Sequence, residues 1–243
     1  MSYVLIVGAK SDIAKAVARE YALNGYNLIL SGRKIEELSG FASDLHIRHG
    51  KKVVLKELDL VDFSSHKAFY DDLNEKPAGV IVVAGYMSDQ SKAQEDWAEV
   101  ITMINVNYTG AVSILNTIAN DFEDRKNGFI IGVSSVAGDR GRKANYIYGS
   151  AKAGFSAYLS GLRNRLFGSE VHVLTVKPGF VATKMTEGLD LPAKLTAQPE
   201  EVARDVFNAQ QKGKDVLYTK GIWRLIMLII KHIPESIFKK MSI

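Results

Sequence analysis

Tyr148 and Lys152 are the residues whose types and spacing point most directly to chemistry. They form a Tyr-x-x-x-Lys pattern, and positions i and i+4 of a helix share one face. A phenol and an ammonium arranged in this way can reach one substrate, and the phenol can give its proton to a developing alkoxide. Because a chain with ten tyrosines is expected to contain such a pair by chance, the pair needs support from other segments.

Further polar residues lie beside apolar runs that are predicted to be strands. Ser135 follows one such run, thirteen residues before the tyrosine. Asn107 lies in a predicted long helix over residues 97–122, and Pro178 begins a Pro-Gly-Phe-Val-Ala-Thr segment after the next run. The carboxyl ends of parallel strands meet at one edge of a sheet, where open α/β folds bind ligands. We therefore expect one site; the alternative is a structural Tyr–Lys pair on an ordinary helix.

The elements that would position these side chains alternate along the whole chain. The apolar runs are continuous, which is typical of strands covered on both faces of a parallel sheet, and helix-period segments separate them. This alternation predicts a doubly wound α/β fold. The predicted strands cover residues 3–8, 27–30, 53–58, 80–84, 129–134, 171–177 and 215–218. We predict one Rossmann domain with a parallel seven-stranded sheet over residues 1–219. An amphipathic helical tail over residues 220–243 either belongs to this domain or associates with a membrane.

The first predicted strand runs into a glycine that opens a helix. Backbone N–H groups and the helix dipole at such a turn can receive a phosphate. The turn consists of Gly8, Lys10, Ser11, Asp12 and Ile13 with their neighbours. Because it contains only one glycine, an ordinary turn in which Ser11 or Asp12 caps the helix is an equal alternative.

Taken together, these segments resemble the single-domain short-chain dehydrogenase/reductase family over nearly the whole chain. The family motifs T-G-x-x-x-G-I-G, N-N-A-G and P-G-x-x-x-T correspond to residues 7–14, 82–85 and 178–183. The resemblance implies a catalytic set of Asn107, Ser135, Tyr148 and Lys152. It also implies a nicotinamide cofactor held by the turn residues above, by Tyr148 and Lys152, and by Asp59, Leu60, Ala84, Gly85, Pro178, Gly179, Val181 and Thr183.

Two departures from the family pattern bear on the cofactor. Asp12 and Ala14 replace the second and third glycines of the first motif, and Val82 and Val83 replace both asparagines of N-N-A-G. Ala14 is small enough to preserve close packing between helix and strand. The carboxylate of Asp12 would be unfavourable beside a pyrophosphate unless it caps the helix and points away. These departures concern cofactor affinity rather than the reaction.

The implied mechanism is carbonyl reduction. Lowering the pKa of a tyrosine from about 10 to about 7 takes roughly 4 kcal/mol, which one ammonium about 4 Å away supplies at an effective dielectric of about 20. Lys152 is therefore expected to lower the pKa of Tyr148 and, by resemblance, to hold the nicotinamide ribose. Tyr148 is the acid, Ser135 places the substrate oxygen, and Asn107 anchors a water molecule.

The residue after the second strand bears on the choice of nicotinamide. An acidic residue there would bind the adenosine ribose of NAD, but the chain has Ser31-Gly32-Arg33. Arg33 can pair bidentately with a 2′-phosphate, with Ser31 and Lys10 assisting. We therefore predict NADP(H) rather than NAD(H); the alternative is that Arg33 only begins the next helix.

The tail carries the excess of positive charge. The net charge of the chain is +4, and from Lys220 onward there are five basic residues and one acidic residue. Charge confined to a tail does not suggest a nucleic-acid partner. As a helix ending at Pro234, the tail places Ile222, Ile226, Ile229, Ile230 and Ile233 on one face and Lys220, Arg224 and Lys231 on the other. Such a helix can lie in a membrane interface, or its apolar face can cover the core, a dimer interface or the cleft.

Some segments more closely resemble the reductase subunit of the decaprenylphosphoryl-ribose 2′-epimerase and its bacterial relatives. These segments are residues 8–18, residues 134–142 and the Trp-basic-Ile-Pro tail. Those proteins reduce a keto-pentose carried on a polyprenyl phosphate. The resemblance implies that Arg140, Arg142 and the tail face an anionic, lipid-linked substrate; the alternative for both arginines is simple solvation.

We therefore predict an NADP(H)-dependent reductase of a ketone, with a keto-sugar, free or polyprenyl-phosphate-linked, as substrate. The alternatives are a reductase of a small soluble ketone or 3-oxoacyl thioester, and a non-catalytic nicotinamide-binding regulatory module. We expect no nucleic-acid partner and a homodimer or homotetramer. The absence of cysteine excludes disulfides and thiolate metal sites, and His46 and His49 lack a third ligand, so we expect no metal. The N-terminal segment lacks the pattern of a signal peptide, which predicts a cytoplasmic protein, peripheral at the inner face of the membrane if the tail binds there.

Overall fold

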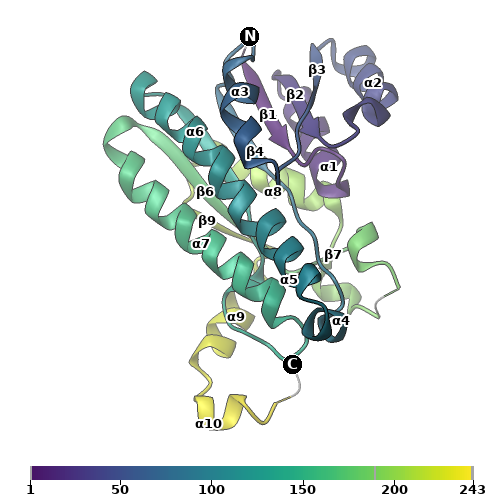
Figure 1. Cartoon of the computed structure of the whole chain (residues 1–243), viewed down its shortest axis with the longest axis vertical. Coiled ribbons are helices and arrows are strands. Elements are labelled where there is room, and N and C mark those ends of the chain that lie inside the picture. Colours follow the sequence, from purple (N-terminus) through teal and green to yellow (C-terminus); the bar gives the residue numbers. More distant parts are fainter. Residues whose placement is uncertain (1, 189, 242–243) are drawn as a thin grey trace.

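The computed structural model describes residues 2–188 and 190–241. Seven parallel strands form one sheet in the order β3-β2-β1-β4-β5-β6-β9 (Figure 1). The strands are β1 Tyr3–Val7, β2 Asn27–Gly32, β3 Val53–Glu57, β4 Gly79–Val82, β5 Gly128–Val133, β6 Val171–Pro178 and β9 Val216–Thr219. The predicted α/β fold with a parallel seven-stranded sheet is confirmed, and every predicted strand overlaps an observed one.

Helices cover both faces of this sheet (Figure 1). They are α1 Asp12–Leu23, α2 Ser39–His49, α3 His66–Asp71, α4 Gln90–Glu95, α5 Trp97–Ile104, α6 Gly110–Arg125, α7 Tyr146–Leu166, α8 Pro199–Gln211, α9 Ile222–His232 and α10 Glu235–Phe238. The predicted long helix is present as α5 and α6, joined by a π-helical turn over Asn105–Thr109. The short helix α4 was not predicted.

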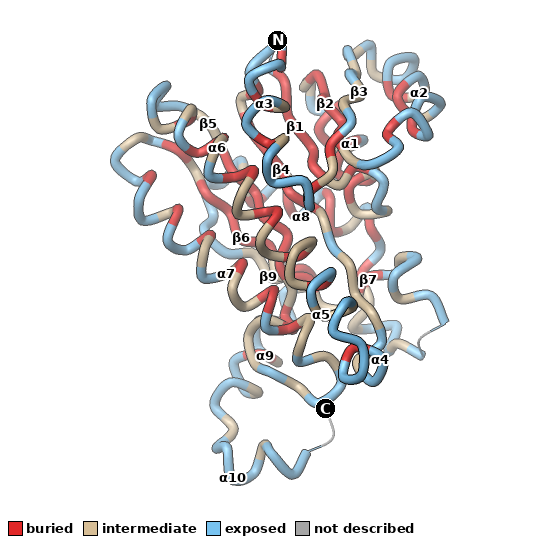
Figure 2. Tube along the Cα trace, in the orientation of Figure 1, coloured by how far each residue is buried: buried red, intermediate tan, exposed pale blue. Residues whose placement is uncertain are grey.

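Alternate residues of β1 show how the two layers of the core arise. Val4 and Ile6 pack in the cluster that includes side chains of α1 and α8. Leu5 and Val7 pack in the opposite cluster, with side chains of α6 and α7. All four are fully buried, because a strand in this position has no face open to water. Figure 2 shows this buried centre, with the exposed positions on the outer turns of the helices.

A small two-stranded sheet lies outside the main one. β7 Phe180–Val181 pairs in parallel with β8 Thr196–Ala197. The chain therefore leaves the main sheet after β6 to form β7, and it pairs with β7 again at β8 before α8 begins. The predicted cofactor motif at residues 178–183 runs from the end of β6 through β7.

The tail forms the helix that its sequence predicts, but the predicted packing face is partly wrong. Trp223 and Met227 are the buried residues of α9, and Ile226 and Ile230 pack beside them. Ile222 and Ile229 were expected on the same apolar face, but both are more than half exposed. The helix carries apolar residues over most of its circumference, so its sequence did not determine which arc would face the core.

The described residues include no helix that is long and apolar enough to cross a membrane.

Candidate active site

A cleft of about 560 Å³ opens at the carboxyl edge of the sheet. It lies where the chain order reverses between β1 and β4, which is where ligands bind in open α/β sheets. Eight of the predicted cofactor residues line it: Gly8, Lys10, Ser11, Arg33, Asp59, Leu60, Ala84 and Gly85. Val83, which replaces a motif asparagine, also lines it.

Gly8 allows the first turn to approach the end of β4. Its φ is +82°, and a Cβ atom would lie 2.8 Å from the backbone nitrogen of Ala84, so no other residue fits there without a backbone shift. Ser11 then caps α1, because its Oγ accepts a hydrogen bond from the backbone N–H of Ala14 at 3.1 Å. The turn is thus a narrow backbone cradle that opens a helix.

Asp12 does not cap α1, because Ser11 does, but its carboxylate has a hydrogen-bond partner in a distant segment of the chain. Oδ2 of Asp12 accepts a hydrogen bond from the backbone N–H of Lys184 at 2.9 Å. The carboxylate is therefore directed at the segment that follows β7. The residue that replaces a family glycine serves as a tie between the first turn and this segment, which sequence reasoning did not predict.

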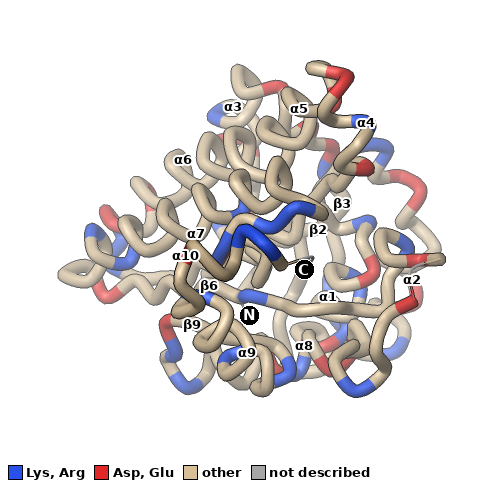
Figure 3. The backbone as a smooth tube through the Cα atoms, turned by 90° about the horizontal axis from the view of Figure 1, so that it is seen from below, with Lys and Arg blue, Asp and Glu red and all other residues tan. Residues whose placement is uncertain are grey.

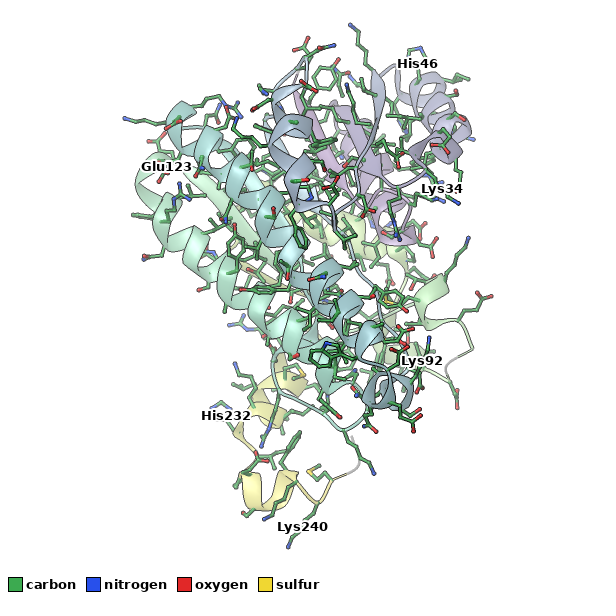
Figure 4. All side chains as sticks on the ribbon, viewed as in Figure 1. Lys34, His46, Lys92, Glu123, His232 and Lys240 are labelled. Atoms are coloured by element: carbon green, nitrogen blue, oxygen red, sulfur yellow. The ribbon has the colours of Figure 1, made fainter. Side chains whose placement is uncertain are left out.

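Arg33 and Lys34 form a basic rim at the end of β2. Lys34, labelled in Figure 4, has a positive φ of 49°. Glu57 fixes this turn by accepting the backbone N–H groups of Lys34 and Ile35 at 2.7 and 3.0 Å, and these hydrogen bonds lower the pKa of Glu57. Lys34 was missed in the sequence analysis, although it directly follows the arginine that was selected.

Two residues predicted to assist Arg33 are engaged elsewhere. Ser31 is fully buried, and its Oγ donates a hydrogen bond to the backbone oxygen of Ile6 at 3.2 Å. The prediction that its hydroxyl assists a phosphate is wrong, because the side chain points into the sheet. Lys10 lines the cleft but pairs with Glu37 at 2.6 Å.

The ammonium of Lys152 lies beside Ala84 and Gly85, two residues that line this cleft. Only 3% of the residue is exposed, and its Nζ donates to the backbone oxygens of Val133 at 3.1 Å and Ala84 at 3.4 Å. Burial lowers the pKa of Lys152 to about 8. Its position on α7 directs the ammonium to the ends of β4 and β5, between the segment at Ala84 and the segment that follows Val133.

Tyr148 lies one turn earlier on α7 and is partly open to solvent. Burial of its hydroxyl raises the pKa to about 12, and a hydrogen bond with the Ser135 side chain lowers it in part. The expected direction of the shift is therefore reversed in this structure. The Lys152 ammonium lies 5.7 Å from the centre of the phenol ring and binds two carbonyl oxygens, so the cost of burial dominates. The structure does bring Ser135 and Tyr148 together.

Asn107 lies in the π-helical turn, and its side-chain amide is hydrogen-bonded to backbone groups. Its Nδ2 donates to the oxygens of Tyr86 at 2.6 Å and Met103 at 2.9 Å, and its Oδ1 accepts from the N–H of Tyr86 at 3.3 Å. The amide therefore joins the long helix to the segment after β4. Its expected role as a water anchor is untested by these contacts.

Asn107, Lys152 and Met185 all lie close to Gly85. A Cβ atom on Gly85 would lie 3.5 Å from Oδ1 of Asn107, 3.8 Å from Nζ of Lys152 and 3.6 Å from Cε of Met185. The absence of a side chain at Gly85 keeps this space open. Met185 belongs to the segment tied by Asp12 and was not predicted.

The segment after Ser135 is pressed onto α7 at two glycines. A Cβ on Gly138 would lie 2.7 Å from the backbone of Lys152, and one on Gly149 would lie 2.8 Å from the oxygen of Ala137. Asp139 then accepts hydrogen bonds from Lys177 at 2.5 Å and from the Tyr218 hydroxyl at 2.7 Å. These contacts fix Ser135 against the helix that carries the tyrosine.

Arg140 does not face the site as predicted. Its guanidinium donates to the backbone oxygens of Ile230 and Ile233, pairs with Glu235 at 2.9 Å and lies 3.6 Å from the ring centre of Phe238. The expectation that it binds a substrate anion is wrong, because the tail uses its donors. Arg142 is partly buried and its Nε has no hydrogen-bond partner among the described residues.

The residues of the P-G-x-x-x-T segment lie beside the tail rather than among the lining of the cleft. A Cβ on Gly179 would lie 1.9 Å from Nε1 of Trp223, so this glycine provides the space for the indole. Thr183 begins a 3₁₀ turn with a reciprocal cap from Thr186. Pro178 ends β6 and Val181 lies in β7. Ile13 is packed against the core.

The described residues contain no group of three or more His, Asp or Glu side chains that could hold a metal ion. The arrangement instead combines a backbone cradle, a basic rim and a buried ammonium next to a phenol and a hydroxyl. The cradle at Gly8 and the open space at Gly85 fit a dinucleotide that runs from the basic rim to the ammonium. The phenol and hydroxyl can then act on a carbonyl beside it.

Comparison with known proteins agrees with this geometry. The sequence model of the short chain dehydrogenase family matches residues 2–193. An uncharacterized oxidoreductase of Mycobacterium tuberculosis is 34% identical over 241 residues, covering 98% of this chain and 96% of that one.

Two solved structures share the fold. A short-chain dehydrogenase from Sphingobium yanoikuyae in complex with NADPH has a TM-score of 0.83 at 21% identity, covering 97% of this chain and 98% of that one. An actinorhodin polyketide ketoreductase with NADPH has a TM-score of 0.80 at 19% identity, with coverages of 90% and 96%. On the family match and the relative together, this chain belongs to the short-chain dehydrogenase family of oxidoreductases.

Proposed function

We propose that the protein is an NADP(H)-dependent reductase that converts a ketone into a secondary alcohol. The observation that carries this proposal is the convergence of three groups next to Ala84 and Gly85 of the cleft. There the Lys152 ammonium, the open space at Gly85 and the Ser135–Tyr148 pair lie on adjoining elements. The nicotinamide cofactor supplies a hydride when bound. The residues of the chain bind it, orient the carbonyl and deliver a proton.

Tyr148 is the proposed proton donor. Since its pKa is about 12, the phenol is protonated at neutral pH, as a donor to a developing alkoxide has to be. Ser135 directs its hydroxyl to the same substrate oxygen. The Lys152 ammonium, charged below about pH 8, stabilises the negative charge that develops and holds the nicotinamide ribose. In the oxidative direction Tyr148 is the base.

NADP(H) is preferred over NAD(H) in this proposal. Arg33 and Lys34 lie together on the rim of the cleft, and Lys10 lies near them. A 2′-phosphate at this rim would receive a bidentate guanidinium contact. The two solved structures of the same fold described above, which contain NADPH, support the same choice of cofactor. Asp12 does not oppose the pyrophosphate, because its carboxylate is held by Lys184.

The proposed substrate is a keto-sugar, with a polyprenyl-phosphate-linked keto-pentose as its most specific form. The resemblance to the reductase subunit of decaprenylphosphoryl-ribose 2′-epimerase supports it, together with the position of the apolar, basic tail directly behind Gly179. Arg142, with its unpartnered Nε, is the remaining arginine near the catalytic segment for a substrate anion. Arg140 is excluded from this role.

Two alternatives to a keto-sugar reductase are each supported by an observation. The fold shared with a polyketide ketoreductase favours a small ketone or a 3-oxoacyl thioester. The two replaced motif glycines and the two replaced asparagines favour a non-catalytic nicotinamide-binding module. Consumption of NADPH, measured by its absorbance, separates all three.

The assay compares a polyprenyl-phosphate-linked keto-pentose in detergent, free keto-sugars, small ketones and 3-oxoacyl thioesters. We expect the lipid-linked substrate to give a kcat/KM at least a hundredfold above the free sugars. A higher value for a small ketone or a thioester would contradict the substrate assignment. NADPH binding without turnover of any of them would favour the non-catalytic module.

We further propose a homodimer or homotetramer, located in the cytoplasm and peripheral at the inner face of the membrane. The outward face of α7 supports the assembly, because the exposed residues Ser150, Ala157 and Gly161 are small and share one side of the helix. Small side chains let a second helix approach closely. The membrane location depends on the tail.

A further inference from the structure

α9 has a second apolar face that nothing in the described chain covers. Its inner face, with Trp223 and Met227, is buried against the core. On the other side Ile222, Leu225, Leu228 and Ile229 are each between 52% and 58% exposed. In α10, Ile237 is 55% exposed. We call these five residues the tail face. An apolar surface gathered on so short a segment indicates an interaction site.

The charges around the tail face are positive. Arg224 and Lys231 lie on α9, and Lys239 and Lys240 follow α10. Across the described residues, none of these four cations pairs with a carboxylate. Figure 3 looks onto this end of the molecule and shows basic positions along the tail, and Figure 4 labels Lys240 at its far end.

The one acidic residue of the tail is already neutralised. Glu235 pairs with Arg140 at 2.9 Å, so it cannot balance the four cations. A second copy of this chain on the tail face would bring two equal sets of positive charge together, because a two-fold interface pairs identical patches. An anionic surface would complement the patch instead.

The tail face is held in a fixed orientation. Arg140 binds the last carbonyl groups of α9 and lies over the ring of Phe238. On the inner face, Nε1 of Trp223 donates to the backbone oxygen of Leu195 at 3.0 Å, and the indole fills the space at Gly179. The tail face is thus attached to the segments on both sides of the proposed substrate site, and it lies at the end of the molecule where the strands end (Figure 1).

We propose that the tail face docks the protein onto a bilayer that contains anionic phospholipid. α9 lies in the plane of the interface, its outer apolar side chains enter the boundary with the acyl chains, and the four cations contact lipid phosphates. Docking in this orientation places Gly179 and Leu195 behind the helix, with the substrate site next to the membrane. Docking itself does not depend on the proposed function. Only the purpose, access to a lipid-linked ketone, rests on it.

Co-sedimentation of the full chain with vesicles tests the proposal. Vesicles of phosphatidylcholine with phosphatidylglycerol are expected to bind the protein, phosphatidylcholine alone is expected to bind it much more weakly, and added salt is expected to release it. Leu225→Glu with Ile229→Glu should weaken binding at least tenfold, because two side chains lose burial in the interface. Both residues are exposed, so thermal unfolding should be unchanged.

Matched controls distinguish docking through the tail face from non-specific binding to vesicles. Ile47→Glu, on the 81% exposed Ile47 of α2, should leave vesicle binding unchanged. Lys239→Gln with Lys240→Gln should weaken binding several-fold, whereas Lys212→Gln with Lys214→Gln, at an exposed turn before β9, should not.

Three results would overturn the proposal. The first is that the wild type does not bind anionic vesicles, and the second is that Ile47→Glu weakens vesicle binding as much as the tail substitutions do. The third is that the Leu225 and Ile229 substitutions dissociate an oligomer of a protein that does not bind vesicles, which would make the tail face a contact between copies. The proposed function fails separately. Vesicle binding without reduction of the lipid-linked ketone removes the substrate and keeps docking, and reduction in detergent without vesicle binding removes only docking.

Discussion

At the scale of single residues, burial has the main influence on the pKa values of the proposed catalytic pair, Tyr148 and Lys152. It lowers the pKa of Lys152 to about 8 and raises that of Tyr148 to about 12. Both shifts favour the neutral side chain. The ammonium is therefore held at an energetic cost, which the carbonyl oxygens of Val133 and Ala84 offset only in part. Such a cost is typical of a group retained for its chemistry.

We predict that Lys152→Met abolishes reduction and stabilises the fold at pH 7. The pKa of the lysine is about 8 in the folded chain and about 10.4 when unfolded. Below pH 8 the lysine is charged in both the folded and the unfolded chain. The folded state then bears the whole cost of burying the ammonium, at most about 3 kcal/mol. Between these pKa values the unfolded state binds more protons, and wild-type stability rises with pH.

Urea denaturation at pH 7 and at about pH 10 measures this difference. The stability advantage of Lys152→Met should be largest at pH 7 and should shrink at the higher pH. An advantage that is constant with pH would contradict the assigned pKa.

Arg33→Ala tests the choice of cofactor. Loss of a charge-assisted bidentate contact costs about 1.5–3 kcal/mol, so the dissociation constant of NADPH should rise roughly ten- to a hundredfold. That of NADH should stay nearly constant. Fluorescence titration of both nucleotides gives the two constants. The matched control is Arg48→Ala, at an exposed arginine in the last turn of α2 that does not line the cleft. A preference for NADH in the wild type, or no effect of Arg33→Ala, would refute the NADP(H) assignment.

At the scale of elements, the sequence predicted what depends on regular patterns. Continuous apolar runs predict the strands of a parallel sheet, and all seven are present. The five inner strands are largely buried, whereas β3 and β9 at the two edges are partly exposed. Because parallel strands end at one edge, the predicted Ser135, Tyr148 and Lys152 meet there. Spacing along the chain does not specify where a side chain points. The hydroxyl of Ser31 turned inward to Ile6, and Asp12 found a backbone partner 172 residues away.

In the tail, too, the spacing of residues in the sequence did not specify which side of the helix would be buried. α9 is apolar on two arcs, and only the tertiary contacts of Trp223 with Gly179 and Leu195 decide which arc is buried. The resemblance to the epimerase reductase, and the place of Arg140 between Ser135 and Tyr148 in the sequence, predict that Arg140 faces a substrate anion. Its actual partners lie about ninety residues later, and no local pattern relates the two.

The two faces of α9 should respond differently to truncation. Trp223→Ala removes a buried indole and leaves the Leu195 carbonyl without its donor, so the free energy of unfolding should fall by about 3–5 kcal/mol. Leu225→Ala, on the exposed arc, should change it by no more than about 0.5 kcal/mol. Denaturant unfolding of the two variants measures both values. Equal effects would contradict the assignment of the inner and outer faces.

At the scale of the whole molecule, the site and the tail share one end. The reversal of strand order places the cleft between β1 and β4, and the tail packs behind Gly179 at the same edge. The outward face of α7 is left for assembly with a second copy. The proposed cofactor binding, membrane docking and assembly would thus use different surfaces.

Ala157→Arg tests this division of surfaces. A long charged side chain on the small-residue face of α7 should prevent close approach of a second helix, so light scattering should show a smaller assembly than for the wild type. Vesicle binding should be unchanged. A wild type that is already monomeric would contradict the proposed assembly.

The most direct test of the central claim is Tyr148→Phe. This substitution removes only the hydroxyl that we propose as the proton donor, while Lys152 and the cleft stay intact. NADPH consumption with the best ketone of the assay series gives kcat, and fluorescence titration gives the dissociation constant of NADPH. We predict a fall in kcat of at least a hundredfold with NADPH affinity nearly unchanged. Turnover of Tyr148→Phe at the wild-type rate would show that this residue is not the acid and that the proposed mechanism is wrong.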